Sequence, residues 1–172
     1  MYDESFWNKR YANSEYLYGT EPNSFLAEQY GLLNGPVLSL SEGEGRNAVF
    51  LASRGLEVLA VDISSVALEK ARKLANSRGV EIKTMVADLA TYEPEENQYG
   101  SVVSISAHLP SVVRKKLYPL VERSVKPNGI IILEAYSENQ LSRDTGGPKD
   151  VDMLMTVDKL QREFPNLSLI HI

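Results

Sequence analysis

Apolar and polar residues follow two different periods along this chain, and the two kinds of segment take turns. Short apolar runs bounded by turn residues are typical of strands, and they predict strands over residues 37–40, 57–61, 81–86, 101–106, 130–133 and 167–172. Apolar residues that recur every three to four positions predict helices between them, over residues 46–54, 65–78, 111–125 and 156–164. Strands that alternate with helices indicate an α/β fold, in which helices cover both faces of a mostly parallel sheet.

The composition narrows the functions open to this chain of 172 residues, a length that suits one domain. It contains no cysteine, which excludes disulfides, thiolate zinc sites and cysteine nucleophiles. His108 and His171 are its only histidines, so we expect no bound metal and read His171 as structural.

The net charge and the first residues of the chain indicate which partners and which cellular compartment to expect. The net charge of −5 disfavours nucleic acid and favours small or cationic ligands. The acidic first residues lack the basic region of a signal peptide, and no apolar run is long enough to span a bilayer. We therefore expect a cytoplasmic protein with no membrane partner.

A short glycine-containing loop follows the first predicted strand. It consists of Ser41, Glu42, Gly43, Glu44 and Gly45. Asp62 stands nineteen positions after Gly43, at the end of the second strand, where an acid can accept hydrogen bonds from ribose hydroxyls. Because glycines let a ligand approach the backbone closely, the pattern predicts a nucleoside site at the carboxyl edge of the sheet. A tight turn with two solvated glutamates is the alternative.

The charge of this loop distinguishes between two nucleoside cofactors. The spacing Gly43-x-Gly45-x-x-Ala48 also fits the dinucleotide fingerprint. A dinucleotide would bring two phosphates against Glu42 and Glu44, and like charges roughly 4 Å apart in a partly screened site cost on the order of 4 kcal/mol. S-adenosylmethionine has no phosphate, and nearby acids favour its sulfonium and ammonium. The loop therefore predicts S-adenosylmethionine, with a nicotinamide cofactor as the alternative.

Further cofactor contacts are predicted where other strands end. Asp88 follows the third strand, where an acceptor can take the adenine amino group, and Leu89 can pack on the ring. A helix cap is the alternative role of Asp88. Ile63, which follows the second strand, and Ser106, the last residue of the fourth, complete the predicted cofactor site.

These residues resemble the class I S-adenosylmethionine-dependent methyltransferases, and the resemblance covers roughly residues 36–133. Three motifs are similar to the bacterial tellurite-resistance type and its thiopurine-methylating relatives. They are Glu42-Gly43-Glu44-Gly45-Arg46-Asn47, Tyr18-Gly19-x-x-Pro22-Asn23 and Thr145-Gly146-Gly147-Pro148. The resemblance implies a doubly wound, three-layer Rossmann-like fold with strand order 3-2-1-4-5-7-6, strand 7 antiparallel, and methyl transfer to small nucleophiles.

The sequence departs from the family pattern at three places. Ser39 stands where most of the superfamily has an acid, and Glu42 is its hypothetical replacement as partner of the methionine ammonium. Ser41 replaces the first loop glycine, which narrows the permitted backbone angles. The family's last strand is expected to be lacking, so that the chain is either a fragment or completes its sheet edge differently. An exposed edge of that kind invites pairing with another chain.

Methyl transfer needs a nucleophile in line with an activated methyl group, so positioning is the main contribution expected of the protein. His108 follows the fourth strand on the expected substrate side, and its ordinary pKa near 6.5 suits a catalytic base. A histidine hydrogen-bonded within a loop is the alternative. Thiolates and oxyanions, including those of heavier chalcogens, need no base. The loop also lacks the Asn/Asp-Pro-Pro-aromatic motif of enzymes that methylate DNA bases or glutamine.

Residues 1–35 hold eight of the fourteen aromatic side chains. We expect them to form a helical lid on a Rossmann-like core at residues 36–172, within a single domain over 1–172. Trp7, Tyr11 and Tyr18 are candidate lid or substrate residues, because aromatic faces attract cations by roughly 0.5–2 kcal/mol. Simple packing on the sheet is the alternative. The irregular residues 137–155 are the other segment expected to select the acceptor.

The leading prediction is therefore S-adenosylmethionine-dependent methyl transfer to a small thiol, oxyanion or chalcogen oxyanion. Two alternatives stay open. One is a module that binds S-adenosylmethionine without catalysing, which the uncharged Ser39 and the lacking strand motivate. The other is an NAD(P)-dependent oxidoreductase.

Overall fold

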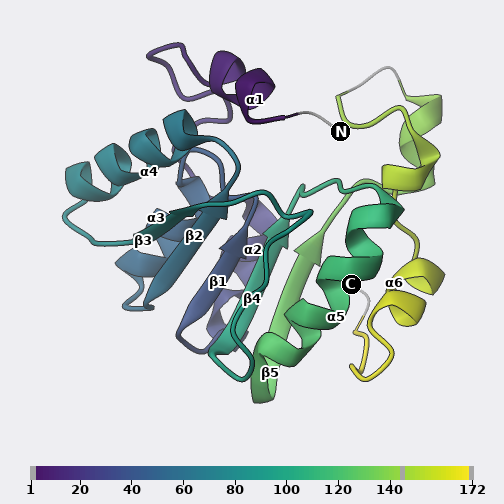
Figure 1. Cartoon of the computed structure of the whole chain (residues 1–172). Helices are drawn as coiled ribbons and strands as arrows, with labels where there is room; N and C mark the ends of the chain where they lie inside the picture. Colours follow the sequence, from purple (N-terminus) through teal and green to yellow (C-terminus); the bar gives the residue numbers. More distant parts are fainter. Residues whose placement is uncertain (1–2, 144–145, 171–172) are drawn as a thin grey trace.

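A five-stranded parallel sheet forms the centre of the computed structural model, which describes residues 3–143 and 146–170 (Figure 1). Its strands are β1 (Val37–Leu40), β2 (Val58–Asp62), β3 (Lys83–Val86), β4 (Tyr99–Ile105) and β5 (Val125–Glu134). They lie in the order β3-β2-β1-β4-β5, and every pairing is parallel. The predicted α/β class is confirmed, and the order agrees with the first five strands that the resemblance implies.

Helices cover both faces of this sheet. The described residues form α1 (Glu4–Arg10), α2 (Ser24–Gln29), α3 (Arg46–Ser53), α4 (Ser65–Ser77), α5 (Ser111–Ser124) and α6 (Val157–Glu163), with short 3-10 helices η1 (Tyr30–Leu32), η2 (Glu138–Ser142) and η3 (Val151–Met153). Side chains of α5 and α6 share one apolar cluster with the sheet, and those of α2, α3 and α4 share another. The fold is therefore doubly wound, with three layers.

The alternation of side chains along β1 explains why the short strand contributes to both clusters. Val37 packs with the α2–α4 layer, whereas Leu38 and Leu40 pack with the α5 layer, because successive strand residues point to opposite faces. All four residues of β1 are buried. Each buried leucine of this kind contributes roughly 1.5–3 kcal/mol.

The predicted sixth strand at residues 167–172 is wrong over its described part, because residues 167–170 form no strand. The turn after α6 places this segment against α5, where the Asn166 backbone N–H donates to the Glu122 carboxylate at 2.9 Å. A strand needs a neighbour to take its backbone hydrogen bonds, and α5 offers none. Leu167 packs on the core while Ile170 is 82% exposed. His171, in the predicted strand, lies outside the described residues.

The carboxyl ends of the strands meet at one edge of the sheet, and the two least regular segments gather there. Helix α1 contacts α4 at this edge, and the stretch with η2 and η3 follows β5 there (Figure 1). An isolated parallel bridge between Ser137 and Met155 closes that stretch at its base. No helix in the described part of the chain has the length and hydrophobicity to cross a bilayer.

Candidate functional site

The loop after β1 is built on three residues in left-handed backbone conformations. Ser41, Gly43 and Gly45 have φ values of 51°, 66° and 93°. Serine in this region costs roughly 1–2 kcal/mol relative to glycine, which is the constraint that the sequence predicted. The loop stays in place because the Glu42 backbone N–H donates to the Val61 carbonyl at 3.1 Å.

Glu42 turns into the protein rather than toward solvent. Its Oε1 accepts hydrogen bonds from the backbone N–H groups of Asn47 at 3.0 Å and Ala48 at 2.9 Å, in the first turn of α3. The Ser39 hydroxyl donates to its other oxygen. The Glu42 carboxylate therefore lies beside Ser39, the position at which the family resemblance implies an acid. Burial raises its pKa to about 7, against the opposing effect of these hydrogen bonds.

Asp62 lies directly against the glycine loop. Its Oδ2 accepts the Gly43 backbone N–H at 2.8 Å, and its Oδ1 accepts the Ser64 backbone N–H at 2.8 Å. Burial raises the pKa of this carboxyl, although the backbone hydrogen bonds favour its charged form. The pairing of Asp62 with the loop, inferred from a spacing of nineteen residues, is therefore present in the folded chain.

The two loop glycines are needed for different reasons. A Cβ on Gly43 would lie 3.1 Å from the Tyr11 hydroxyl. A Cβ on Gly45 would lie 2.7 Å from the Cβ of Ala71 in α4. Gly45 is thus required by helix packing, whereas the absence of a side chain at Gly43 lets the Tyr11 hydroxyl pack close to the loop.

Glu44 does not present an unpaired charge to a ligand, which corrects the basis of the charge argument made from the sequence. It forms a buried ion pair with Lys70 of α4, and its other oxygen accepts the Leu17 backbone N–H at 2.7 Å. Sequence reasoning missed Lys70, because a lysine on a predicted amphipathic helix reads as a solvated residue.

The remaining predicted cofactor residues lie at the same sheet edge. Ile63 is half-buried and Leu89 is buried, while Ser106 is exposed with a φ of 56°. The Asp88 Oδ1 accepts the Ala90 backbone N–H at 2.9 Å within a turn, and because none of the described helices begins there the alternative role of Asp88 as a helix cap is wrong. The other Asp88 oxygen has no partner among the hydrogen bonds described, so it is available to accept the predicted hydrogen bond from the adenine amino group.

His108 is held in its loop by Tyr136, which follows β5. The Tyr136 backbone N–H donates to the His108 Nε2 at 3.1 Å, and the two rings stack with centroids 5.2 Å apart. Burial lowers the pKa of this imidazole. Since Nε2 must be unprotonated to accept a hydrogen bond, the ring is neutral and its basic nitrogen is already occupied.

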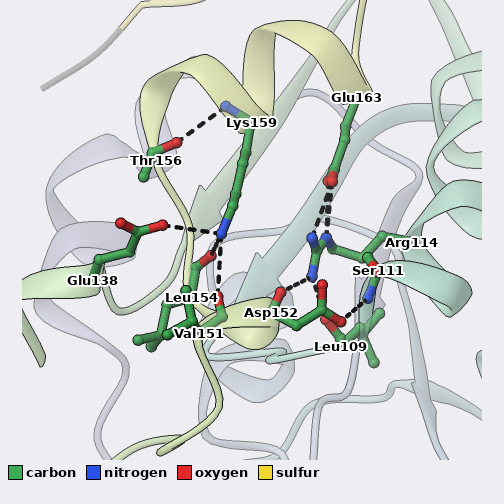
Figure 2. A network of polar contacts seen from close by, with 10 residues as sticks. All are labelled: Leu109, Ser111, Arg114, Glu138, Val151, Asp152, Leu154, Thr156, Lys159 and Glu163. Carbon is green, nitrogen blue, oxygen red and sulfur yellow. Dashed lines mark hydrogen bonds and ion pairs between the residues drawn. The ribbon is translucent and has the colours of Figure 1, made fainter. Parts of the chain in front are cut away.

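Arg114 fixes the segments that border the expected acceptor side. Figure 2 shows its guanidinium extending from α5 to Glu163 of α6, with Nε donating at 2.9 Å. Its Nη1 donates to the carbonyls of Leu109 at 2.5 Å and Asp152 at 2.6 Å. The Asp152 carboxylate in turn accepts the Ser111 backbone N–H at 2.7 Å. The loop after β4 and the stretch before α6 are therefore tied to one buried cation.

Tyr11 contacts both of the other candidate lid aromatics. Trp7 stacks on Tyr11 with centroids 5.7 Å apart, and Tyr18 meets Tyr11 edge to face at 6.5 Å. Tyr11 is buried, Trp7 is half-buried, and half of Tyr18 is exposed. The Asn8 Oδ1 accepts the Ser64 hydroxyl at 2.7 Å, which ties α1 to the start of α4.

One residue of the family-like motif Tyr18–Asn23 has a clear structural role. Asn23 caps α2, and its backbone N–H donates to the Asn47 Oδ1 at 2.9 Å. Its side-chain amide donates to Glu134, at the end of β5, at 2.8 Å. This asparagine therefore joins the N-terminal segment to both sides of the sheet edge. Thr145, the first residue of the Thr145–Pro148 motif, lies outside the described residues.

A relative with a named substrate aligns with most of this chain. It is the 2-heptyl-1-hydroxyquinolin-4(1H)-one methyltransferase of Mycobacteroides abscessus, 24% identical over 134 residues, which make up 76% of this chain. The chain spans only 59% of the length of that enzyme.

Two solved structures have the same fold. One comes from work on the conversion of a disulfide bond into a thioacetal group during echinomycin biosynthesis. It has a TM-score of 0.71 and 22% identity, over 84% of this chain and 68% of that one. The other is a protein of Pyrococcus horikoshii OT3, with a TM-score of 0.60 and 29% identity, over 68% of this chain and 53% of that one.

Comparison of the sequence with models of protein families shows the family to which the chain belongs. The model described as "Methyltransferase domain" matches residues 37–129, which is more than half of the chain. The matched region contains the glycine loop, Asp62, Asp88 and His108. The chain therefore belongs to the methyltransferase-domain family.

Proposed function

We propose that this chain binds S-adenosylmethionine at the carboxyl edge of β1, β2 and β3 and transfers its methyl group to a small-molecule nucleophile. The observation that carries the proposal is the position of Asp62, whose carboxylate contacts the Gly43 backbone at 2.8 Å. This contact brings an acceptor suited to ribose hydroxyls beside a loop that a ligand can approach. Membership of the methyltransferase-domain family supports the same cofactor.

The residues at this edge fit such a cofactor. Gly43 has no side chain, so its backbone can be approached closely, and the Tyr11 hydroxyl lies 3.1 Å from where a Cβ would be. In the proposal Asp62 binds the ribose, Asp88 accepts from the adenine amino group, and Ile63 and Leu89 pack on the ring. Ser41, Glu42, Glu44, Gly45 and Ser106 shape the cradle around the methionine end. When bound, S-adenosylmethionine would supply a methyl group already activated by its sulfonium.

The N-terminal segment is proposed to close this site as a lid. Residues 1–35 and the core at 36–172 would then act together as one domain. Tyr11 supports this role best, because its ring is buried and its hydroxyl lies beside Gly43. Trp7 and Tyr18 extend the aromatic surface outward from it.

The state of His108 bears on the acceptor. A neutral imidazole whose Nε2 already accepts a hydrogen bond is a weak candidate for a base. The proposal therefore favours acceptors that arrive as anions or lose a proton easily: thiols, acidic hydroxyls and chalcogen oxyanions. The hydroxyquinolone named for the mycobacterial relative belongs to that chemical class. Tellurite and thiopurine acceptors belong to it too, in keeping with the family-like motifs.

Calorimetric titration of the chain with S-adenosylhomocysteine, with NADH as control, tests the cofactor. The control matters because Glu44 is paired with Lys70 and Glu42 is turned inward, so the loop repels phosphates less than its sequence suggests. Micromolar binding of S-adenosylhomocysteine alone supports the proposal. Tighter binding of NADH would support an oxidoreductase instead.

An acceptor panel tests the reaction. Transfer of a labelled methyl group would be measured with a thiol, a thiopurine, a hydroxyquinolone, selenite and tellurite. Transfer to any of them supports the proposal. Cofactor binding without transfer to any of them would favour a module that binds S-adenosylmethionine and does not catalyse.

A further inference from the structure

Lys70 is a buried cation at the junction of three parts of the chain. It lies on α4, is only 9% exposed, and pairs with Glu44 of the glycine loop. Its Nζ also donates to the backbone carbonyls of Asn13 at 2.9 Å and Glu15 at 2.7 Å. These carbonyls belong to the segment between α1 and α2. One ammonium therefore joins α4, the glycine loop and the N-terminal segment.

The same segment is attached to this pair from its other side. The Leu17 backbone N–H donates to Glu44 at 2.7 Å. The Tyr16 hydroxyl donates to the Lys70 backbone carbonyl at 3.1 Å, and the Tyr16 ring centroid lies 5.0 Å from the Lys70 Nζ. Residues 13–17 thus provide two acceptors for the ammonium and one donor for the carboxylate of the Glu44–Lys70 pair.

The energetics of such a pair are asymmetric. Burying two charges is costly, and the cost is offset only where the partners also satisfy each other's hydrogen bonds. Here the backbone of residues 13–17 provides those hydrogen bonds. If the segment lifted away, the ammonium would lose two carbonyl acceptors. Removal of one partner alone would leave the other charge buried without compensation, so loss of either residue should destabilise the closed position of the segment.

The residue placed by this arrangement is Tyr11. It is buried two residues before Asn13, with its hydroxyl beside Gly43, and Trp7 stacks on its ring. A weak contact of 3.5 Å between the Lys70 Nζ and the Tyr11 carbonyl joins it to the same cation. The position of the aromatic surface over the loop consequently depends on Lys70.

We infer that Lys70 and Glu44 are positioning residues, whose buried ion pair holds the N-terminal segment over the glycine loop so that Tyr11 closes the cofactor site. The inference rests on the proposed function. Glu44 acts on the cofactor site indirectly, because its charge holds the N-terminal segment in the closed position. Cofactor binding and ordering of residues 11–17 are then coupled, so that loss of the pair lowers the fraction of chains able to bind.

Trp7 provides a direct readout, because it is the only tryptophan of the chain and stacks on Tyr11. The experiment compares the wild type with Lys70→Met in two measurements. The first is the Kd for S-adenosylhomocysteine, and the second is quenching of Trp7 fluorescence by acrylamide. We expect Lys70→Met to raise the Kd about tenfold or more, as when one chain in ten is closed, and to make Trp7 more accessible.

Lys73→Met is the matched control. Lys73 lies on the same helix and pairs with Glu69 at 2.7 Å, but both side chains are exposed. We expect this variant to keep the wild-type Kd and the wild-type quenching. Glu44→Gln is the second test variant, because the amide keeps an acceptor for the Leu17 N–H but removes the charge. It decides the question if Lys70→Met does not fold, as judged by circular dichroism.

Failure of this inference and failure of the proposed function are distinguishable. Wild-type affinity and wild-type quenching in a folded Lys70→Met or Glu44→Gln protein would overturn the inference. A wild type that binds no S-adenosylhomocysteine would overturn the proposed function. Increased Trp7 quenching in the variants would still support the positioning role in that case.

Discussion

The Asp62 carboxylate accepts a hydrogen bond of 2.8 Å from the backbone N–H of Gly43, nineteen positions earlier in the chain. This contact joins the end of β2 to the loop after β1, at the point where two neighbouring parallel strands deliver their carboxyl ends. Ligands of open α/β sheets bind outside the carboxyl ends of the strands. Asp62 thus both fixes the loop and faces the proposed ribose site.

Replacement of Asp62 by alanine is expected to weaken binding of S-adenosylhomocysteine by about 1–3 kcal/mol, which is roughly 5- to 150-fold in Kd. The variant loses the ribose acceptor and leaves the Gly43 N–H without its partner. Calorimetric titration measures the change. Glu57→Ala is the control, since this exposed acid precedes the same strand at its opposite end. An unchanged Kd for Asp62→Ala would remove Asp62 from the site.

Substitution of the two loop glycines is expected to have different effects: one lowers the stability of the fold, and the other weakens cofactor binding. Gly45→Ala places a methyl group 2.7 Å from Ala71 and should lower the melting temperature strongly, by overpacking that typically costs 1–3 kcal/mol. Gly43→Ala meets only the Tyr11 hydroxyl, at 3.1 Å, and should chiefly weaken binding. Gly55→Ala controls for backbone strain, because Gly55 has a φ of 85° and open space around it. Equal melting temperatures for all three variants would contradict this division.

The sequence was sufficient to predict features that depend on near neighbours. Apolar periodicity located all five strands of the sheet, because burial of a strand or a helix face repeats with the local geometry. The link between Asp62 and the glycine loop followed from their spacing, since both end adjacent parallel strands. The order of the strands came from the family resemblance, because periodicity does not specify which strands pair.

Features that depend on distant partners could not be predicted. Nothing near Lys70 in the sequence indicates that Glu44 and the backbone of residues 13–17 enclose it. The alternation at residues 167–170 resembles a strand, but Asn166 holds that segment against α5. The need for glycine at position 45 comes from Ala71, which another helix supplies. Each case was decided by tertiary packing.

The buried Glu42 should make stability depend on pH in an unusual direction. Its folded-state pKa of about 7 lies above its ordinary value of 4.5, so the folded protein holds the proton more tightly than the unfolded chain. The free energy of unfolding should therefore fall between about pH 4.5 and pH 7 by about 1.4 kcal/mol per pH unit, and level off above pH 7.

Glu42→Gln tests this dependence, because glutamine cannot titrate. The free energy of unfolding, measured with urea, is compared between the variant and the wild type at each pH. The variant should gain stability relative to the wild type on going from pH 5.5 to pH 8. The exposed Glu95→Gln serves as the control and should show no such change. Parallel pH profiles for Glu42→Gln and the wild type would mean that Glu42 stays charged throughout, held so by its hydrogen bonds from α3 and Ser39.

Arg114→Lys is expected to loosen the acceptor side while leaving the cofactor side intact. Lysine keeps the charge but cannot reproduce the fork that binds Glu163, Leu109 and Asp152 together. We expect the acceptor KM to rise severalfold with an unchanged Kd for S-adenosylhomocysteine. Arg123→Lys, on the same helix with an exposed partner, is the control. A rise in the Kd equal to that in the KM would indicate a general loss of structure instead.

His108→Gln is expected to retain catalysis if the histidine is structural. The Nε2 of His108 accepts the Tyr136 N–H at 3.1 Å, and a glutamine oxygen can take the same hydrogen bond. Removal of a true general base lowers kcat by roughly 10²–10⁴-fold, whereas loss of an imidazole that only accepts this bond should cost less than about tenfold. The measurement is kcat with the best acceptor of the panel, from about pH 5 to pH 9. Because burial lowers the pKa of His108, a catalytic role would make the wild-type kcat fall below pH 6.5, and this fall would disappear in the variant.

If the wild-type kcat falls in this way and the variant loses at least a hundredfold in kcat, His108 is the base and its contact with Tyr136 must open when the acceptor binds.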